Sequence, residues 1–193
     1  MRKIPTVFLR DPDDMRRVTR DVHPDCKWVL TGEGTATRKY DGTCVMLDDF
    51  GLWWARREVK PGKKPPANYQ PIGIDDTTGK TVGWEPIGQS AFVKFHTEAL
   101  AAWADRYDAS PGPGTYELLG PKINGNPEWA DVHCLVRHAW AMPLPDSPRD
   151  FEGLAEWLTA RRYEGIVWHH PDGRMAKLKR RDFPTERAEE DET

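Results

Sequence analysis

The sequence predicts an α+β fold of largely antiparallel β-sheets with flanking helices. Strand-like segments occur in pairs joined by short turns, and two segments have apolar residues at the spacing of an amphipathic helix. Because the helices do not alternate regularly with the strands, an alternating βαβ fold is not indicated. The 193 residues suit a single domain with a sizeable core.

The first predicted strand covers residues 35–47, which are rich in β-branched and apolar residues. Asp48–Gly51 has the composition of a turn, and residues 52–58 are predicted to return as a second strand. The expected hairpin carries Lys39 on one arm and Arg56-Arg57 on the other. Neighbouring strand residues face opposite sides, so at most one of the two arginines can share a face with a site.

Residues 60–90 are rich in Pro, Gly and Lys and lack sustained periodicity. A long ordered loop or an insertion is therefore predicted there rather than a core element. Three lysines of this segment could bind nucleic-acid phosphates, and an ordinary solvated loop is an equally good interpretation: Lys60, Lys63 and Lys64.

Two amphipathic helices are predicted. In residues 97–107 the apolar side chains recur at helical spacing, with Thr97 as a candidate cap. The second helix is preceded by Ser147–Asp150, which has capping-box spacing and a proline at the first helical position. Its expected buried face consists of four residues: Phe151, Leu154, Ala155 and Leu158.

Four further strands follow from short apolar runs bounded by turn residues. Residues 115–120 and 133–142 are predicted strands on either side of the turn Asn124–Pro127. Residues 164–170 and 174–180 are predicted to form a hairpin around a Pro-Asp-Gly turn. The acidic segment 184–193 is predicted to be a disordered tail after a domain of residues 1–183.

Composition narrows the class of protein. No apolar run approaches the roughly 20 residues of a membrane span, and the N-terminus does not resemble a secretory signal, so we expect a cytoplasmic protein. Three widely spaced cysteines indicate neither a disulfide framework nor a zinc cluster. The net charge is −3, but Glu186–Glu192 holds five acidic residues and one arginine, so nucleic acid is not excluded as a partner.

The residues Lys39-Tyr40-Asp41-Gly42 carry the strongest functional signal. A lysine with the reference pKa of about 10.4 is protonated at neutral pH and is a poor nucleophile. A nucleophilic Lys39 therefore needs nearby cations or burial to favour its neutral form.

This motif matches the Lys-x-Asp-Gly signature of the covalent nucleotidyltransferases, which include DNA ligases, RNA ligases and mRNA capping enzymes. Further segments resemble later motifs of that superfamily in the expected order: Arg56, Tyr116–Gly120, His138–Trp140, Glu164–Val167 and Lys177–Lys179. Longer strings most resemble a family of small stand-alone ATP-dependent RNA ligases: Lys39–Cys44, Trp54–Arg56, Ile123–Pro127 and Glu164–His169.

The resemblance implies a nucleotidyltransferase (ATP-grasp-like) ligase domain that uses ATP and Mg²⁺ or Mn²⁺. It implies that Lys39 attacks the α-phosphate of ATP to form lysyl-AMP, with Lys177 and Lys179 stabilising the developing charge. Glu164 would hold the metal ion, because carboxylate oxygens suit hard cations.

The remaining implied contacts are with the nucleotide. Glu117 would accept hydrogen bonds from ribose hydroxyls, Arg56 would contact the nucleotide or the phosphate to be joined, and Trp140 would stack on adenine. The implied substrate is RNA with 5′-phosphate and 3′-hydroxyl ends, and we expect a monomer without a membrane partner.

Several alternatives stay open. The run Lys177–Arg181 could be a solvated face, Trp140 could be a core residue, and Glu117 and Glu164 could form ordinary surface pairs. Many ligases have glutamate before the lysine, where this chain has Arg38. The chain could also seal nicked DNA or an RNA-DNA hybrid, or could bind RNA without catalysis.

Overall fold

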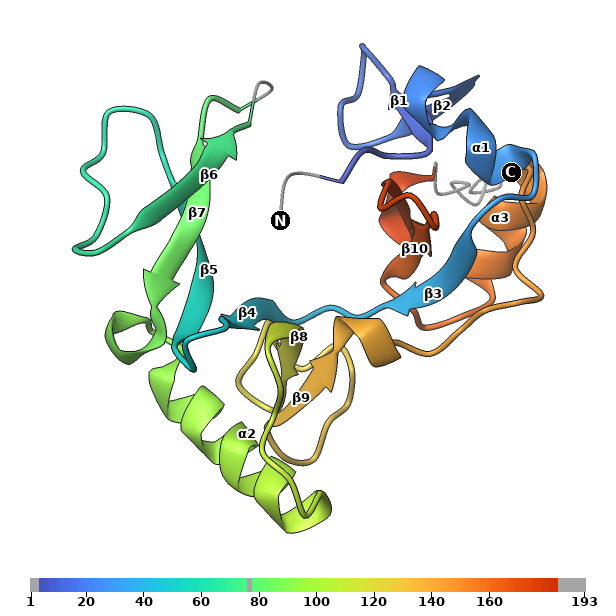
Figure 1. Cartoon of the computed structure of the whole chain (residues 1–193). Coiled ribbons are helices and arrows are strands. Elements are labelled where there is room, and N and C mark those ends of the chain that lie inside the picture. The colour runs from blue at the N-terminus through green and yellow to red at the C-terminus, as the bar shows by residue number, and fades with distance from the viewer. Residues whose placement is uncertain (1–3, 76–77, 184–193) are drawn as a thin grey trace, which may run out of the picture. The chain divides into compact units, whose positions relative to one another are not determined.

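The computed structural model describes residues 4–75 and 78–183, which divide into two compact units (Figure 1). The central unit is Asp41–Ala141, and the terminal unit combines Ile4–Tyr40 with residues 142–183. Both units contain antiparallel sheets with few helices, so the predicted α+β class is confirmed. The predicted tail, residues 184–193, lies outside the described residues.

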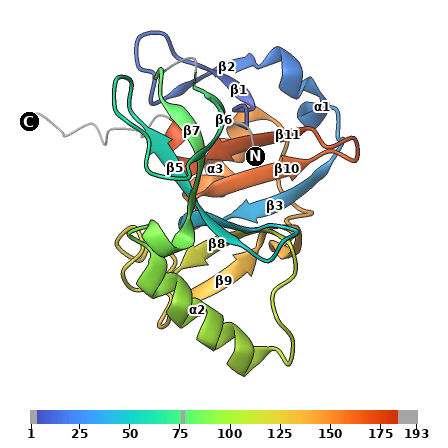
Figure 2. The same ribbon diagram turned by 60° about the vertical axis from the view of Figure 1, so that its left-hand side comes forward.

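The terminal unit is built on a three-stranded antiparallel sheet in the order β11-β10-β3 (Figure 2). Its strands are β3 (Thr35–Lys39), β10 (Gly165–His169) and β11 (Met175–Lys179). The other elements of this unit are β1 (Phe8–Arg10), β2 (Val18–Val22), η1 (Pro24–Cys26), α1 (Lys27–Leu30), α3 (Phe151–Thr159) and η4 (Arg180–Asp182).

Side chains alternate across this sheet, so one face is apolar and the other polar. The apolar face belongs to a buried cluster that includes Leu154 and Leu158 of α3. The sheet contributes five residues to this cluster: Ala36, Ile166, Trp168, Ala176 and Leu178. Lys39, Lys177 and Lys179 have the opposite parity in the registered strands and therefore lie on the polar face.

The central unit is built on a six-stranded antiparallel sheet in the order β6-β7-β5-β4-β8-β9. Its strands are β4 (Thr43–Leu47), β5 (Trp53–Val59), β6 (Gln70–Ile74), β7 (Thr81–Pro86), β8 (Gly114–Leu119) and β9 (Cys134–Arg137). Helix α2 (Val93–Arg106) lies against β8 and β9 in Figure 1, with Ala99 and Trp103 in one buried cluster with Tyr116 and Leu118. Two 3-10 helices complete the unit, η2 (Ile87–Gln89) and η3 (His138–Trp140).

The predicted single strand over residues 35–47 is wrong, because the chain changes sheet within it. β3 ends at Lys39 and pairs with β10, whereas β4 begins at Thr43 and pairs with β5 and β8. A side chain at Gly42 would lie 2.3 Å from the carbonyl oxygen of Leu118, so only glycine permits this close approach. Lys39 is therefore not on the hairpin that carries Arg56.

The segment 60–90 also differs from the expectation that it holds no core element. Residues 60–69 contain no strand, but β7 pairs with both β5 and β6, and Trp84 is buried. Pro and Gly obscured the strand pattern, and burial of Trp84 stabilises it. The prediction of one domain with an insertion here stays a prediction.

The observed boundaries of two helices and one strand differ from the predicted ones by a few residues. α2 begins four residues before Thr97, whose hydroxyl donates to the Val93 carbonyl 3.0 Å away instead of capping the helix. α3 is capped by Asp150, which accepts a hydrogen bond from the Gly153 amide at 2.8 Å. The predicted strand over 133–142 is shorter than expected, since it passes into η3 after Arg137.

The buried histidine of α2 gives a prediction about stability. His96 is 3% exposed, and burial lowers its pKa from 6.5 to about 4. Between these pH values the unfolded chain binds a proton that the folded chain does not. The free energy of unfolding should therefore fall by about 3 kcal/mol from this group as the pH decreases across that window.

The variant His96→Phe keeps an aromatic ring against Trp53. Its free energy of unfolding, measured with urea from pH 7 to pH 4, should depend less steeply on pH than that of the wild type. An equally steep dependence in the variant would refute this role for His96.

Among the described residues, no helix is both long and apolar enough to cross a membrane.

Candidate active site

The terminal unit brings Lys39, Glu164 and Lys179 into direct contact. Gly165 is paired with Lys39 on one side and with Lys179 on the other, so Glu164 enters the sheet between the two lysine-bearing strands. One carboxylate oxygen of Glu164 contacts Lys39 Nζ, and the other lies 2.5 Å from Lys179 Nζ. We call these three residues the lysine cluster.

The lysine cluster is largely shielded from water. The Glu164 side chain is 9% exposed, and those of Lys39 and Lys179 are 22% and 17% exposed. Burial raises the pKa of Glu164, but the charges of Lys39 and Lys179 and their hydrogen bonds lower it more, so this pKa lies below its usual value. Glu164 is therefore an anion at neutral pH and holds two cationic side chains.

Two backbone contacts fix the positions of these side chains. The Glu164 carbonyl accepts a hydrogen bond of 2.8 Å from the Arg180 amide. The Lys179 amide donates to Asp182 at 2.9 Å, and the buried Asp182 also forms an ion pair of 2.8 Å with Arg10. The chain after β11 thereby holds Lys179 in place.

Gly165 allows the strands of the lysine cluster to approach. A side-chain carbon at this position would lie 2.0 Å from the Leu178 carbonyl oxygen and 2.8 Å from the Lys179 α-carbon. We expect Gly165→Ala to destabilise the protein by about 2 kcal/mol or more, measured by urea unfolding, because backbone must move. Gly88→Ala, with nothing near its added carbon, is the control. Equal stability of the two variants would contradict the steric argument.

Lys177 shares the polar face with the lysine cluster. It lies across from Val167 on β10, and its backbone also bonds to Pro5 and Val7. Thr37 and His169 lie on the same face, with Thr37 Oγ1 and His169 Nε2 3.0 Å apart. The structure thus places three predicted lysines on one face, and it adds a threonine and a histidine that the sequence did not assign.

Arg38 lies on the face opposite to Lys39, as alternation requires. Its guanidinium stacks over the rings of Tyr40 and Tyr163, at 4.6 and 4.4 Å from their centroids. Cation–π contacts of this kind stabilise a strand locally. Arg38 therefore anchors β3 beside the lysine cluster from the other side of the sheet.

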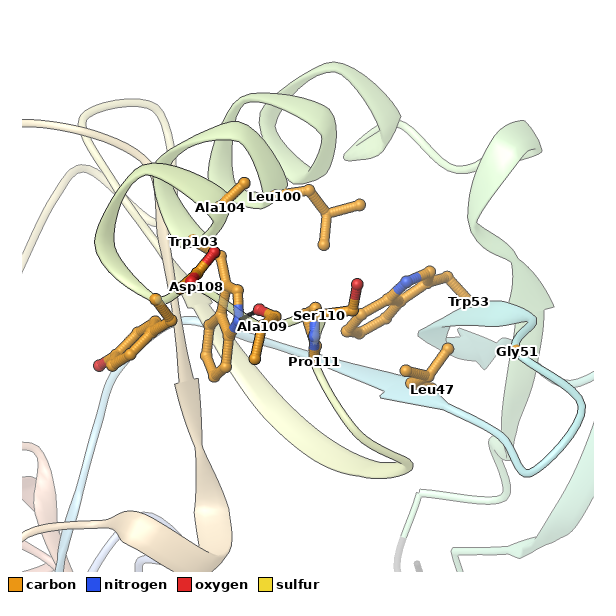
Figure 3. Close-up of a pocket in the computed structure, with 11 residues that line it drawn as sticks. Leu47, Gly51, Trp53, Leu100, Trp103, Ala104, Asp108, Ala109, Ser110 and Pro111 are labelled. Carbon is orange, nitrogen blue, oxygen red and sulfur yellow. Dashed lines mark hydrogen bonds between the residues drawn. The ribbon is translucent and has the colours of Figure 1, made fainter.

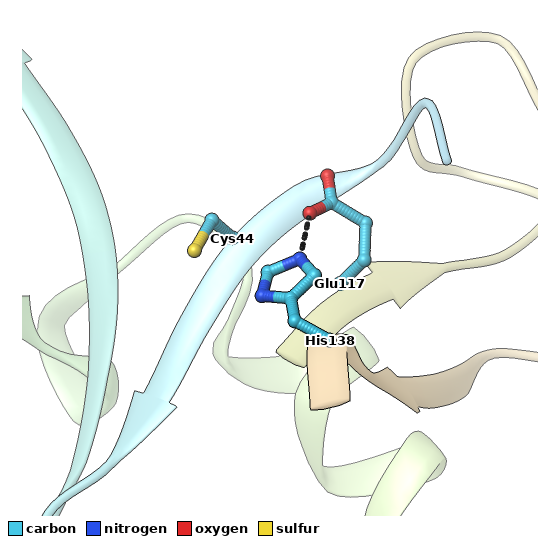
Figure 4. Close-up of side chains that lie close together, drawn as sticks. All are labelled: Cys44, Glu117 and His138. Atoms are coloured by element: carbon cyan, nitrogen blue, oxygen red, sulfur yellow. Dashed lines mark hydrogen bonds and ion pairs between the residues drawn. The ribbon is translucent and has the colours of Figure 1, made fainter. Parts of the chain in front are cut away.

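In the central unit, Glu117 joins the backbone of Gly42 to the ring of His138. Its Oε1 accepts a hydrogen bond of 3.1 Å from the Gly42 amide, and its Oε2 lies 2.9 Å from His138 Nε2 (Figure 4). His138 Nδ1 is in turn 2.9 Å from Thr115 Oγ1. Glu117 is buried, so these contacts hold its carboxylate in a defined orientation.

The Asp41-Gly42 pair is held by residues that the sequence reasoning left without a role. Asn124 Nδ2 donates to the Gly42 carbonyl at 2.8 Å, and Glu128 accepts from the Asp41 amide at 2.8 Å. Asn124 has a positive φ of 49°, which asparagine tolerates better than most residues. In the sequence, Asn124 stood out only as part of the segment Ile123–Pro127, which resembles RNA ligases.

Arg56 lies on the same face of the six-stranded sheet as Glu117. The register pairs Cys44 with Glu117 and Met46 with Trp54, so alternation places Arg56 on that face and Arg57 on the other. The Arg56 guanidinium is 5.6 Å from the ring centroid of Trp84.

Trp140 makes contacts with α2. Its ring stacks on Trp103 with centroids 5.9 Å apart, and Arg137 lies over it at 5.2 Å. The tryptophan is nevertheless 58% exposed, so part of its ring is open to solvent. Adenine stacking by Trp140 stays a prediction. His138, two residues earlier, is the member of this string that reaches Glu117.

A cavity of about 710 Å³ opens beside the C-terminal part of α2 (Figure 3). Its lining includes Leu47, Trp53, Trp103 and Pro111. None of the predicted site residues, all of which lie in the described part of the chain, contributes to this lining. The cavity is therefore not lined by the predicted site residues.

Comparisons with known proteins show similarity to RNA ligases. A family model described as RNA ligase 1 matches residues 112–192, a segment that includes Glu117, Trp140 and Glu164–Lys179. RNA ligase 1 of Danio rerio is 24% identical in an alignment that covers 92% of this chain and 79% of the relative. Both findings confirm the predicted resemblance to an RNA ligase family.

Proposed function

We propose, from the similarity to RNA ligase 1, that this chain is an ATP-dependent RNA ligase with a nucleotidyltransferase fold. The observation that carries the proposal is the lysine cluster. A motif lysine, a buried carboxylate and a second lysine, separated by up to 140 positions in sequence, meet on the polar face of one sheet. Burying like charges around one carboxylate has an electrostatic cost, which is typical of functional sites.

In the proposed first step, the Lys39 amine attacks the α-phosphorus of ATP. The amine gives up a proton to solvent, a nitrogen–phosphorus bond forms, and the bond to the pyrophosphate oxygen breaks. An amine attacks only in its neutral form, so Lys39 must leave its contact with Glu164 before it reacts. Lys177 and Lys179 supply positive charge for the phosphate oxygens in the transition state.

In the next two steps the AMP group moves to RNA and then leaves. A 5′-phosphate oxygen attacks the lysyl-AMP phosphorus and forms a pyrophosphate linkage, while the nitrogen–phosphorus bond breaks and the Lys39 amine takes up a proton from solvent. A 3′-hydroxyl then attacks the activated 5′-phosphate, loses its proton to solvent and expels AMP, which joins the strands. All three steps are displacements at phosphorus, so they require positioning and charge stabilisation rather than further nucleophiles.

The donor set in the terminal unit fits Mg²⁺ or Mn²⁺. Such ions are commonly bound through one or two carboxylates together with water and substrate phosphates, and Glu164 offers a buried, ionised carboxylate. Both oxygens of this carboxylate contact lysines, so metal binding would replace at least one of these contacts. When bound, the ion would neutralise phosphate charge.

The central unit is proposed to bind the nucleoside and the phosphates. Glu117 would accept hydrogen bonds from the ribose, Arg56 would contact phosphate, and Trp140 would stack on adenine. Support for the first two roles is that Glu117 and Arg56 share one face of the sheet. Support for the third is the exposed ring of Trp140.

The test is incubation of the protein with ATP labelled at the α-phosphate and Mg²⁺ or Mn²⁺, followed by denaturation. We expect label on the protein from α-labelled ATP and none from γ-labelled ATP. Absence of α-label under both metals would refute the proposed chemistry. Tight RNA binding without label would instead indicate a non-catalytic RNA-binding protein.

The RNA specificity is tested separately, by end joining on single-stranded RNA, nicked RNA, nicked DNA and an RNA-DNA hybrid. We expect joining of RNA ends that carry a 5′-phosphate and a 3′-hydroxyl. Preference for DNA would overturn the proposed substrate while leaving the lysyl-AMP step intact.

A further inference from the structure

Three side chains of the central unit, Cys44, Glu117 and His138, form a cluster of metal-ligating groups (Figure 4). Cys44 on β4 lies directly across from Glu117 on β8, so their side chains leave the same face of the sheet as neighbours. His138 begins η3 immediately after β9, the strand that pairs with β8 on its other side. The thiol, carboxylate and imidazole atoms all lie within 4.8 Å of one another.

The three atoms suit a borderline-soft transition metal. Zinc accepts sulfur, nitrogen and oxygen ligands at about 2.0–2.3 Å, so ligand atoms on a tetrahedral ion are about 3.5 Å apart. The cluster would have to contract by roughly an ångström from its outer limit, which side-chain rotation can provide. Mg²⁺ prefers oxygen ligands and would not use the thiol.

The neighbours of the cluster orient its members. Thr115 Oγ1 is 2.9 Å from His138 Nδ1, and a hydroxyl can either donate to this nitrogen or accept from it. Thr115 can therefore accept a hydrogen bond from a protonated Nδ1 while Nε2 binds an ion. The Gly42 amide bonds to Glu117 Oε1 and leaves Oε2, the atom beside His138, for a metal.

We propose that Cys44, Glu117 and His138 bind one Zn²⁺ ion, with water in the fourth position. A thiolate and a carboxylate together would balance the charge of the ion. The side chains of Glu117 and His138 are 12% and 27% exposed, so an ion can enter from solvent without unfolding. Binding releases the thiol proton and replaces the Glu117–His138 hydrogen bond with two metal bonds.

One consequence rests on the proposed function. Glu117 is the proposed ribose ligand, and a bound Zn²⁺ would occupy its Oε2 in place of the hydrogen bond from His138. Zn²⁺ would therefore inhibit formation of lysyl-AMP, in competition with ATP, whereas Mg²⁺ or Mn²⁺ would support it.

The first experiment needs no enzymatic activity. Titration of the reduced, metal-free protein with Co²⁺ should produce a thiolate-to-cobalt charge-transfer band with one ion per chain, and Zn²⁺ should abolish it. Cys44→Ser should remove the band, and His138→Asn should weaken Zn²⁺ binding by about 100-fold. Cys134→Ser, which alters another partly buried thiol of the same sheet, should retain both the cobalt band and the Zn²⁺ affinity of the wild type. A band that survives in Cys44→Ser but disappears in Cys134→Ser, or no band in the wild type, would overturn the proposed site.

The second experiment measures lysyl-AMP formation with increasing Zn²⁺ at a fixed Mg²⁺ concentration. We expect Zn²⁺ to inhibit the wild type and Cys134→Ser. Cys44→Ser should be at least about 10-fold less sensitive to Zn²⁺. Equal inhibition of all three proteins would refute the link between zinc and the nucleotide. If the cobalt band is present but no protein takes up label, the zinc site stands and the proposed function fails.

Discussion

Lys39→Arg should take up no label from α-labelled ATP, with a loss of about three orders of magnitude or more relative to the wild type. Arginine keeps the positive charge and can retain the ion pair with Glu164, so the fold of the terminal unit is preserved. Its guanidinium stays protonated and cannot act as the nucleophile. The label on denatured protein therefore reports the chemistry of this one nitrogen.

The matched control for this prediction is Lys94→Arg, since Lys94 is an exposed lysine on α2. It should label like the wild type. Circular dichroism and thermal unfolding of both variants should match the wild type as well. Persistent labelling of Lys39→Arg in a folded state would assign the nucleophile to another residue and overturn the proposed role of Lys39.

Glu164→Gln should lose labelling and also lower the stability of the protein. Glutamine cannot neutralise the charges of Lys39 and Lys179. These two partly buried lysines would then lack the carboxylate that both contact in the wild type. We expect a loss of about 1–3 kcal/mol at pH 7, smaller than for a fully buried pair because both lysines retain some exposure. Urea unfolding gives the difference.

The pH dependence separates this electrostatic effect from a packing defect. The pKa of Glu164 is lowered in the folded protein, so its contribution is fully present above the pKa of about 4.3 in the unfolded chain. The contribution disappears as the pH falls through the lower folded value. The stability gap between wild type and Glu164→Gln should therefore narrow at low pH.

Glu156→Gln, at an exposed position of α3 in the same unit, should leave both labelling and stability near those of the wild type. If the difference in stability between the wild type and Glu164→Gln were constant from pH 7 to pH 3, the charge of Glu164 would not be its cause.

The hairpin of β10 and β11 was predictable because β10 is an apolar run, β11 alternates apolar residues with lysines, and the two strands are close in sequence and joined by a turn with strong residue preferences. The same holds for α3, whose buried residues Leu154 and Leu158 follow helical spacing. The break between β3 and β4 was not predictable in this way. β-branched and apolar residues occur on both sides of the turn-prone pair Asp41-Gly42 and led to one predicted strand, whereas the close approach of the Leu118 carbonyl at Gly42 is seen only in the structure.

The sequence by itself determined the α+β class, the resemblance to RNA ligases, and the identities of Lys39, Glu164 and Lys179 as candidates. These follow from local spacing and from short motifs, which need no knowledge of contacts distant in sequence. The tertiary structure decided that Glu164 bridges two lysines, that Arg38 lies on the opposite face, and that His138 reaches Glu117. Strand register sets these contacts, because a shift of one residue would turn each side chain to the other face of its sheet.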